Sequence, residues 1–213
     1  MIWFDAILAP NNRYKKVVFC ANKALSQSNQ HSAILRACIS MATDVSKIKY
    51  VHGDQNMLGD LKGLWEKLNR YHCEHSEHFK QYYLNMTFEK RKADLLKKAE
   101  GGEMRVDLAI DETTCQDIAY LVSTINSAKL GEIDSVFVEE PYRRMGFGGK
   151  LMQNALTRMD ARGAVEKTVE VSLGNESVWE FYGRFGFLPR KTTYPKTSKI
   201  GYVCKFFLTL KVH

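Results

Sequence analysis

The sequence has none of the features that mark a membrane-spanning, secreted or disulfide-stabilised protein. No run of apolar residues approaches the roughly 18 that a membrane-spanning helix requires. The amino end, Met1-Ile2-Trp3-Phe4-Asp5, lacks the basic residues that begin a secretory signal. The five cysteines are an odd, scattered set without a Cys-x-x-Cys pair, so they indicate buried thiols rather than a disulfide framework. We expect a cytoplasmic protein with no membrane partner.

Internal repeats and low-complexity tracts are also absent, and 213 residues with 45% apolar content suit one main core. The formal net charge is +7, but the basic residues are dispersed, so we do not expect nucleic acid as a partner. Residues 1–45 lie outside the regular pattern and predict an amino-terminal extension, which is either an ordered appendage or a dispensable leader. Because its apolar content is high for a disordered segment, we favour an appendage that packs on the domain or on a second copy, as in a homodimer. Residues 46–213 are expected to form the domain.

Apolar spacing along the domain predicts strands and helices in turn. Strands are predicted where polar and apolar residues alternate, and helices where apolar residues recur at three- and four-residue spacing. The predicted strands are 47–51, 104–110, 117–125, 133–138, 167–173 and 202–211, and the predicted helices are 58–68, 87–99, 149–162 and 177–185. The second and third strands form a hairpin, and the strand–helix order after them favours a parallel arrangement in the last part of the chain.

A glycine-rich stretch follows the strand predicted at 133–138 and opens the next helix. It reads Arg143-Arg144-Met145-Gly146-Phe147-Gly148-Gly149-Lys150-Leu151. Glycines allow backbone N–H groups to converge, because no Cβ obstructs them, and the unpaired amides of a first helical turn carry partial positive charge. The stretch therefore predicts a site for a phosphate-bearing cofactor.

Spacing excludes two common phosphate-binding loops. A nucleotide-triphosphate loop of the form Gly-x-x-x-x-Gly-Lys-Ser/Thr would need glycine where Arg144 stands and a hydroxyl residue where Leu151 stands. A dinucleotide loop would need its third glycine at Leu151 as well, within an early strand–helix–strand unit. What remains is Arg-x-x-Gly-x-Gly, formed by Arg143, Gly146 and Gly148.

A second stretch begins about 30 residues further on. It contains a predicted strand, Asn175 at a helix start, Tyr182 seven residues later and a closing Gly186-Phe187 pair. Together with the Arg-x-x-Gly-x-Gly loop, in this order and spacing, it resembles the signatures of the GNAT acetyltransferase superfamily, and the resemblance extends from about residue 48 to the carboxyl end. It implies an α/β fold with a mixed, mostly antiparallel sheet of about six to seven strands flanked by helices.

The resemblance further implies that acetyl-CoA binds as a co-substrate between the two stretches. Main-chain groups at the strand end 136–138 would pair with the acetyl-pantetheine arm and supply oxyanion donors, while amides of residues 144–149 would hold the pyrophosphate. Asn175 would bind the pantetheine arm, and an ordinary helix cap is the alternative role for it. The expected cofactor-binding residues are Val136, Phe137, Val138, Arg143, Arg144, Met145, Gly146, Phe147, Gly148, Gly149 and Asn175.

Two residues are candidates for proton transfer. The resemblance points to Tyr182 as the group that protonates the leaving CoA sulfur, whereas its aromatic neighbours favour a packing role. Glu170, five residues before Asn175, stands where some members carry a catalytic glutamate that acts as the base. Glu132 and Asp134 on the preceding strand are alternatives to it, as is ordered water.

Several aromatic and imidazole residues precede these signatures. In the superfamily the segment that contains His72, His75, Tyr82 and Tyr83 lines the acceptor pocket, and a polar helix end is the alternative. Histidines three residues apart can share a helix face and hold a metal ion. No distant Cys or His pair completes a tetrahedral set, however, so we expect no metal.

Taken with the resemblance, these residues predict an N-acetyltransferase that moves acetyl from acetyl-CoA to a primary amine of a small molecule or a peptide, by direct attack in a ternary complex. The alternative is an acyl-CoA-binding regulatory module of the same fold without turnover. Tyr182 together with Asn175 favours the enzyme. No acceptor-specific pattern is present in the segment 58–85.

Overall fold

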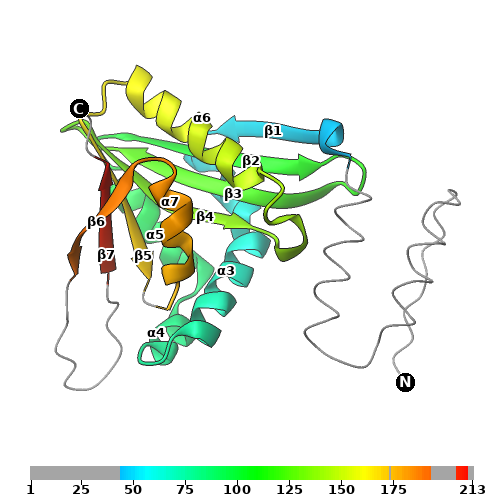
Figure 1. The fold of residues 1–213 in the computed structure, drawn as a ribbon, viewed down its shortest axis with the longest axis horizontal. Coiled ribbons are helices and arrows are strands. Elements are labelled where there is room, and N and C mark those ends of the chain that lie inside the picture. Colours follow the sequence, from blue (N-terminus) through cyan, green and yellow to red (C-terminus); the bar gives the residue numbers. More distant parts are fainter. Residues whose placement is uncertain (1–43, 173, 193–204, 211–213) are drawn as a thin grey trace, which may run out of the picture.

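A single seven-stranded sheet organises the computed structural model, which describes residues 44–172, 174–192 and 205–210 (Figure 1). The predicted extension therefore lies outside the described residues, except for its last two. The strands are β1 Ile48–Gly53, β2 Glu103–Asp111, β3 Gln116–Ile125, β4 Leu130–Val138, β5 Glu166–Ser172, β6 Phe187–Thr192 and β7 Lys205–Leu210. They lie in the order β1-β2-β3-β4-β5-β7-β6, and every neighbouring pair is antiparallel except β4 and β5. The mixed, mostly antiparallel sheet is thus confirmed.

The α-helices connect the strands on both faces of this sheet. They are α3 Lys62–His75, α4 Lys80–Asn85, α5 Phe88–Lys98, α6 Phe147–Ala161 and α7 Trp179–Gly183, and the 3₁₀ turns are η1 Val45–Lys47, η2 Gln55–Leu61, η3 Glu140–Tyr142 and η4 Glu176–Val178. Helix α5 begins where the hydroxyl of Thr87 accepts a hydrogen bond from the Lys90 amide, and its last turn is basic, as the helix dipole favours. None of the helices in the described part of the chain combines the length and hydropathy that crossing a bilayer demands.

Two hydrophobic cores form because both faces of the central strands are buried. On β3, Ala119 and Leu121 pack into the core beneath α6 and α7, whereas Tyr120 and Val122 pack into the core beneath α3 and α5. Figure 1 shows these two pairs of helices on opposite sides of the sheet. A strand covered on both faces needs a continuous apolar run rather than strict alternation, and β3 has one.

The structure corrects four details of the sequence-based assignment. The helix predicted at 58–68 is divided into η2 and α3, the helix predicted at 177–185 is reduced to η4 and α7, and α4 and β6 were not predicted. Strand β6 escaped detection because Pro189 and basic residues interrupt its alternation. Parallel pairing near the carboxyl end is limited to β4 and β5, since β7 inserts antiparallel between β5 and β6. The ends of the strand predicted at 202–211 lie outside the described residues.

Candidate active site

Strands β4 and β5 run side by side only at their beginnings, and a gap opens between their ends. In the described residues their parallel ladder comprises four residue pairs and ends at Ile133 and Val169. Strand β4 also carries a β-bulge against β3, because the register there skips Asp134. The bulge bends β4 at the point where the ladder with β5 stops, so the sheet is split at its centre.

The end of β4 turns main-chain groups toward this gap. The Glu139 amide donates a hydrogen bond of 2.9 Å to the Ile118 carbonyl, so the main chain at Glu139 faces β3. Because successive residues of a strand direct their N–H and C=O groups to opposite edges, those of Val138 and Val136 face the gap. An extended ligand arm can therefore pair with β4 as an added strand would.

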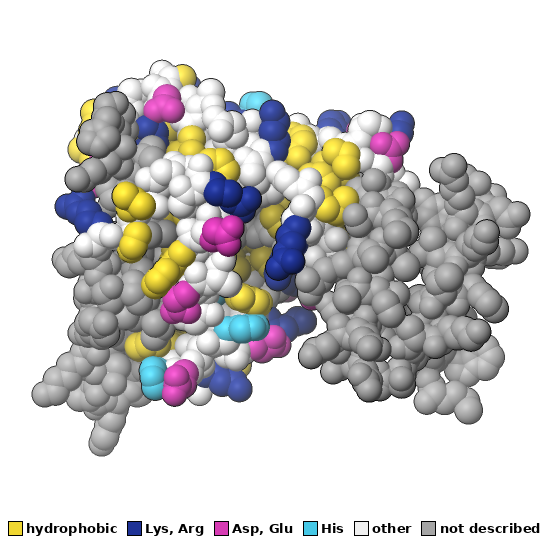
Figure 2. Space-filling model, in the orientation of Figure 1, with side chains coloured by type: hydrophobic (Ala, Val, Ile, Leu, Met, Phe, Trp, Pro, Cys, Tyr) yellow, Lys and Arg dark blue, Asp and Glu magenta, His cyan; other side chains and the backbone are white. Residues whose placement is uncertain are grey.

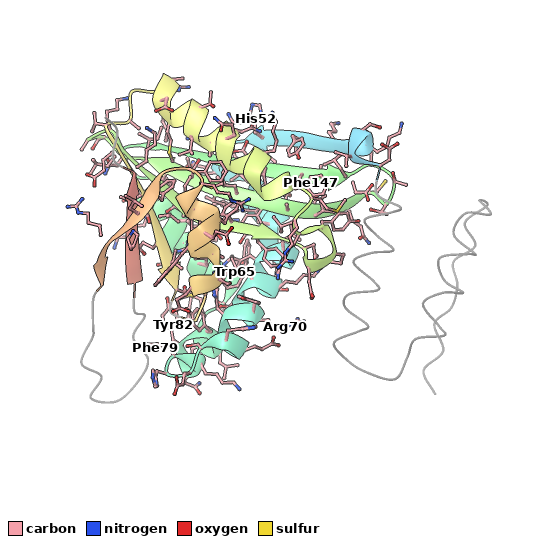
Figure 3. The ribbon with its side chains drawn as sticks, viewed as in Figure 1. His52, Trp65, Arg70, Phe79, Tyr82 and Phe147 are labelled. Atoms are coloured by element: carbon pink, nitrogen blue, oxygen red, sulfur yellow. The ribbon has the colours of Figure 1, made fainter. Side chains whose placement is uncertain are left out.

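A cavity of about 460 Å³ lies at the gap. Strands β4 and β5, helices α3, α4 and α5, and the start of the η4–α7 segment contribute its walls. Figure 3 labels two of the wall residues, Trp65 on α3 and Tyr82 on α4. Three residues singled out from the sequence, Glu170, Asn175 and Tyr182, also line this cavity. Residues that are far apart in the chain are thus brought together at one site.

Tyr182 lies where the hydrophobic core meets the cavity. Its ring packs in the core between Phe181 and Phe187, at centroid distances of 5.3 and 6.1 Å. The side chain is buried and yet forms part of the cavity wall. Burial raises the pKa of Tyr182 well above its ordinary value, and Tyr120 acts in the same direction. Its proton is therefore held more firmly than that of an exposed tyrosine, and the side chain borders the cavity.

Asn175 stands at the amino end of η4, but in the described structure its side chain makes no capping hydrogen bond. The neighbouring Glu176 carboxylate instead accepts a hydrogen bond of 2.9 Å from the Gly174 amide. The half-buried Asn175 amide lines the cavity. Asn175 therefore occupies the cap position of η4, but its side chain does not cap the turn.

The glycine-rich loop adjoins the same gap. Arg144 and Gly146 both adopt positive φ, at 66° and 92°, and α6 begins directly after Gly146. A Cβ added at Gly148 would lie 3.3 Å from Val138 Cγ2, so the first turn of α6 packs closely on the end of β4. A Cβ at Gly146 would meet no protein atom within 4 Å, which leaves open space over the loop. The first amides of this 15-residue helix have no partners within the helix, so this end of α6 carries partial positive charge.

The side chain of Arg143 lies over the end of β4 and against α3. Its guanidinium carbon is 5.6 Å from the ring centre of Tyr71 and 5.6 Å from that of Phe137. Its Nε donates a hydrogen bond of 3.0 Å to the Val138 carbonyl. Arg143 thus contacts both the acceptor-side helix and the strand that borders the gap.

The three carboxylates considered as bases lie in different surroundings. Glu170 is half-buried on β5 and lines the cavity. Asp134 forms an ion pair of 2.7 Å with Lys98 and accepts a hydrogen bond of 2.8 Å from Thr124, and Lys98 also pairs with Glu132. The pKa of Glu132 is raised, chiefly by burial and then by the charge of Asp134. Lys98 thereby binds the two carboxylates of β4 to α5.

Imidazole and phenol rings gather where α3 and α4 border the cavity. His72 stacks on Tyr83 at a centroid distance of 5.4 Å, whereas His75 stacks on Tyr71 at 4.0 Å. Burial raises the pKa of Tyr82, and Tyr82 and Glu170 both line the cavity. No cluster of metal-ligating side chains occurs within the described ranges.

We expect His72 to contribute to the decrease in the free energy of unfolding at acidic pH. Burial lowers its pKa from 6.5 to about 4, and the charges of His75 and Arg91 act in the same direction. Between these two values the unfolded chain binds more protons than the folded one, so stability rises with pH and is lost as pH falls through this window. Lowering the pH from 7 to 5 should therefore remove roughly 2 kcal/mol from the free energy of unfolding through this residue.

Urea denaturation at the two pH values measures this contribution. The variant His72→Asn should lose less free energy of unfolding between pH 7 and 5 than the wild type loses. The variant His52→Asn, at an exposed position on β1, is the matched control and should behave as the wild type. An equal loss in His72→Asn and the wild type would contradict the prediction.

Sequence analysis missed two basic residues of the site, Arg91 and Lys98. The Arg91 side chain donates a hydrogen bond of 2.7 Å to the Asp134 carbonyl, at the β-bulge, and Lys98 pairs with the side chain of the same residue. Both lie on α5, seven residues apart, and therefore on one face of the helix. The spacing of the two residues can be read from the sequence, but the sequence does not show that this face of α5 packs on β4.

Sequence comparison relates this architecture to known proteins. Residues 67–187 match the sequence model described as the Acetyltransferase (GNAT) family. Over 88 residues the chain is 38% identical to N-alpha-acetyltransferase 30 of Schizosaccharomyces pombe, in a match that takes in 41% of this chain and 56% of that protein. The chain thus spans about half the length of this curated relative.

Solved structures of low sequence identity have the same fold. The PaiA N-acetyltransferase of Thermoplasma acidophilum, in complex with coenzyme A, superposes with a TM-score of 0.58 at 15% identity, over 78% of this chain and 99% of that one. A chain of the NatC complex bound to Gag peptide and CoA superposes with a TM-score of 0.56 at 19% identity, again over 78% of this chain and 99% of that one.

Proposed function

The chain belongs to the acetyltransferase (GNAT) family, and on that premise we propose that it transfers an acetyl group from acetyl-CoA to the α-amino group of a peptide. The observation that carries this proposal is the split between β4 and β5, which has the start of α6 at its mouth and Tyr182 and Glu170 in its walls. The choice of a peptide amine is supported by the likeness to N-alpha-acetyltransferase 30.

The donor fits the residues that border the gap. The pyrophosphate would be held by main-chain amides from Arg144 to Gly149, with charge from Arg144 and Lys150, in the open space over Gly146. The pantetheine arm would pair with the main chain of Val136 and Val138 and with the side chain of Asn175. The thioester then lies between β4 and Tyr182, because Tyr182 lines the cavity beyond the strand ends.

Three groups of this chain would carry the reaction. Glu170 takes a proton from the incoming ammonium group, so that the neutral amine can attack the thioester carbon. Main-chain N–H groups of β4 meet the negative charge that develops on the carbonyl oxygen. The C–S bond then breaks, and the phenol of Tyr182 gives its proton to the leaving sulfur. The attacking nitrogen loses its second proton as the amide forms, and this proton restores the phenol, while the proton on Glu170 passes to solvent.

A peptide panel tests the acceptor. Full-length protein and acetyl-CoA are incubated with peptides that have a free α-amino group, with the same peptides blocked at the amino end but carrying an internal lysine, and with small primary amines. Thiol release and mass spectrometry report transfer. We expect acetylation of the free α-amino group alone. Transfer only to small amines would overturn the peptide assignment, and CoA binding without transfer to any amine would favour the non-catalytic module.

The loop assignment predicts that Gly146→Val weakens CoA binding at least tenfold, as measured by isothermal titration calorimetry. Valine is strained at a φ of 92°, and its side chain would project into the open space that the pyrophosphate requires. Gly63→Ala, within α3 and with open space around its Cβ, is the matched control and should retain wild-type affinity. Unaltered affinity in Gly146→Val would discredit the loop as the cofactor site.

A further inference from the structure

We propose that Arg143 is a positioning residue that fastens the acceptor-side helix α3 to the end of β4, and that it is not a ligand of the cofactor pyrophosphate. This inference rests on the proposed function, because it concerns how the acceptor wall is held against the donor strand. It departs from the role that the glycine-rich motif suggests for this arginine.

The side chain of Arg143 contacts α3 and β4. The guanidinium lies over Tyr71 of α3 and over Phe137 of β4, with both ring centres 5.6 Å from its central carbon. Its Nε donates to the Val138 carbonyl at 3.0 Å. Two aromatic rings and one carbonyl oxygen thus contact the guanidinium of this exposed side chain, and aromatic faces attract a planar cation.

A second contact joins the same two elements beside the first. Lys67 of α3 forms an ion pair with Glu139, the residue that follows Val138. Lys67 and Tyr71 are four residues apart, so they lie on one face of α3, and this face meets Glu139 and Arg143. The helix is therefore attached to the strand by one ion pair and one cation–π contact.

This attachment controls the geometry of the acceptor wall. Tyr71 stacks on His75 at a centroid distance of 4.0 Å. His72, which follows Tyr71 in the chain, lines the cavity and stacks on Tyr83. The last turn of α3 is thereby placed relative to Val138, whose main chain borders the gap. Loss of the Arg143 contact should let this turn move away from β4 and misalign the amine with the thioester.

The pyrophosphate retains other partners if Arg143 is occupied in this way. Arg144 and Lys150 are both exposed on the loop and the first turn of α6, and the main-chain amides there need no side chain. The open space over Gly146 lies in this part of the loop. Charge and main-chain donors for the phosphates are thus present without Arg143.

Two acetyl donors distinguish a positioning role from phosphate binding. Peptide acetylation is measured with acetyl-CoA and with S-acetyl-pantetheine, which lacks the pyrophosphate and the nucleotide. We expect Arg143→Ala to lower kcat/KM for the peptide about tenfold with either donor. A phosphate ligand would give a loss with acetyl-CoA and none with S-acetyl-pantetheine, and that result would overturn the proposal. Lys150→Ala is the contrasting variant, because its loss of kcat/KM should be larger with acetyl-CoA than with S-acetyl-pantetheine.

Two further variants separate this role from a general loss of structure. Arg143→Lys keeps the positive charge, but an ammonium group cannot contact both rings and donate a hydrogen bond to Val138 at once. We therefore expect its loss of kcat/KM to be nearly as large as that of Arg143→Ala. Tyr71→Ala should add little to the loss in Arg143→Ala, because the two residues form one contact. Full activity in Arg143→Lys, or additive losses in the double variant, would contradict the proposal.

The same assays separate this proposal from the proposed function. If the wild-type protein acetylates no amine, the proposed function fails and Arg143 variants have no activity to lose. If the wild type acetylates peptides and Arg143→Ala retains its kcat/KM with both donors, the positioning role alone fails.

Discussion

Replacing Tyr182 with Phe should lower kcat by about 100-fold while the KM for acetyl-CoA changes by no more than about threefold. Phenylalanine keeps the ring between Phe181 and Phe187, so the core and the cavity wall remain. The substitution removes only the hydroxyl that would protonate the leaving sulfur. Steady-state kinetics with a peptide acceptor, together with calorimetry for CoA, measure the two effects separately.

The control for Tyr182→Phe is Tyr50→Phe. Tyr50 of β1 packs against the same core but does not line the cavity, so its hydroxyl has no place in the proposed transfer. We expect Tyr50→Phe to keep the wild-type kcat. If Tyr182→Phe also keeps it, the phenol has only a packing role.

The second large effect is expected for Glu170→Gln, which should lower kcat/KM for the peptide about 100-fold at pH 7. Glutamine has nearly the same shape but cannot take a proton from the ammonium group. As pH rises, a growing fraction of the acceptor is already neutral, so the loss should shrink toward alkaline pH. A pH–rate profile of the variant and the wild type from pH 6 to 10 measures this convergence.

Glu166→Gln is the matched control on the same strand. Its carboxylate pairs with Arg190 at 2.9 Å, at the opposite end of β5 from the cavity. We expect a wild-type profile for this variant. A constant loss across the pH range in Glu170→Gln would indicate a structural role, and a wild-type profile in that variant would transfer the role of base to Glu132, whose pKa is raised by burial.

The loop and the second signature were predictable because each is continuous in sequence. Gly146 and Gly148 stand at a fixed spacing before α6, and Asn175 and Tyr182 lie on one short segment after β5. Local spacing of this kind needs no knowledge of tertiary contacts. The same is true of β2, β3 and the helix start at Thr87, where alternation and capping residues act over a few positions.

The arrangement of the acceptor side was not predictable in the same way. The partners of Arg143 are Tyr71, 72 residues earlier, and Phe137 and Val138, which lie close by in sequence on another element. Lys98 likewise meets Glu132 and Asp134, which lie 34 and 36 residues later in the chain. These contacts depend on how α3 and α5 cross the sheet, and side-chain spacing within either helix does not specify that crossing.

The amino-acid sequence by itself determined the alternation of strands and helices, the glycine-rich start of α6 and the family that the two signatures indicate, because each depends on residues close together in the chain. Only the tertiary structure decided that the ladder between β4 and β5 ends at Ile133, that Tyr182 both packs in the core and lines the cavity, and that Arg143 reaches α3. The physical reason is that sheet register, the bulge at Asp134 and helix packing arise from contacts between distant segments, which compete for the same space once the chain is folded.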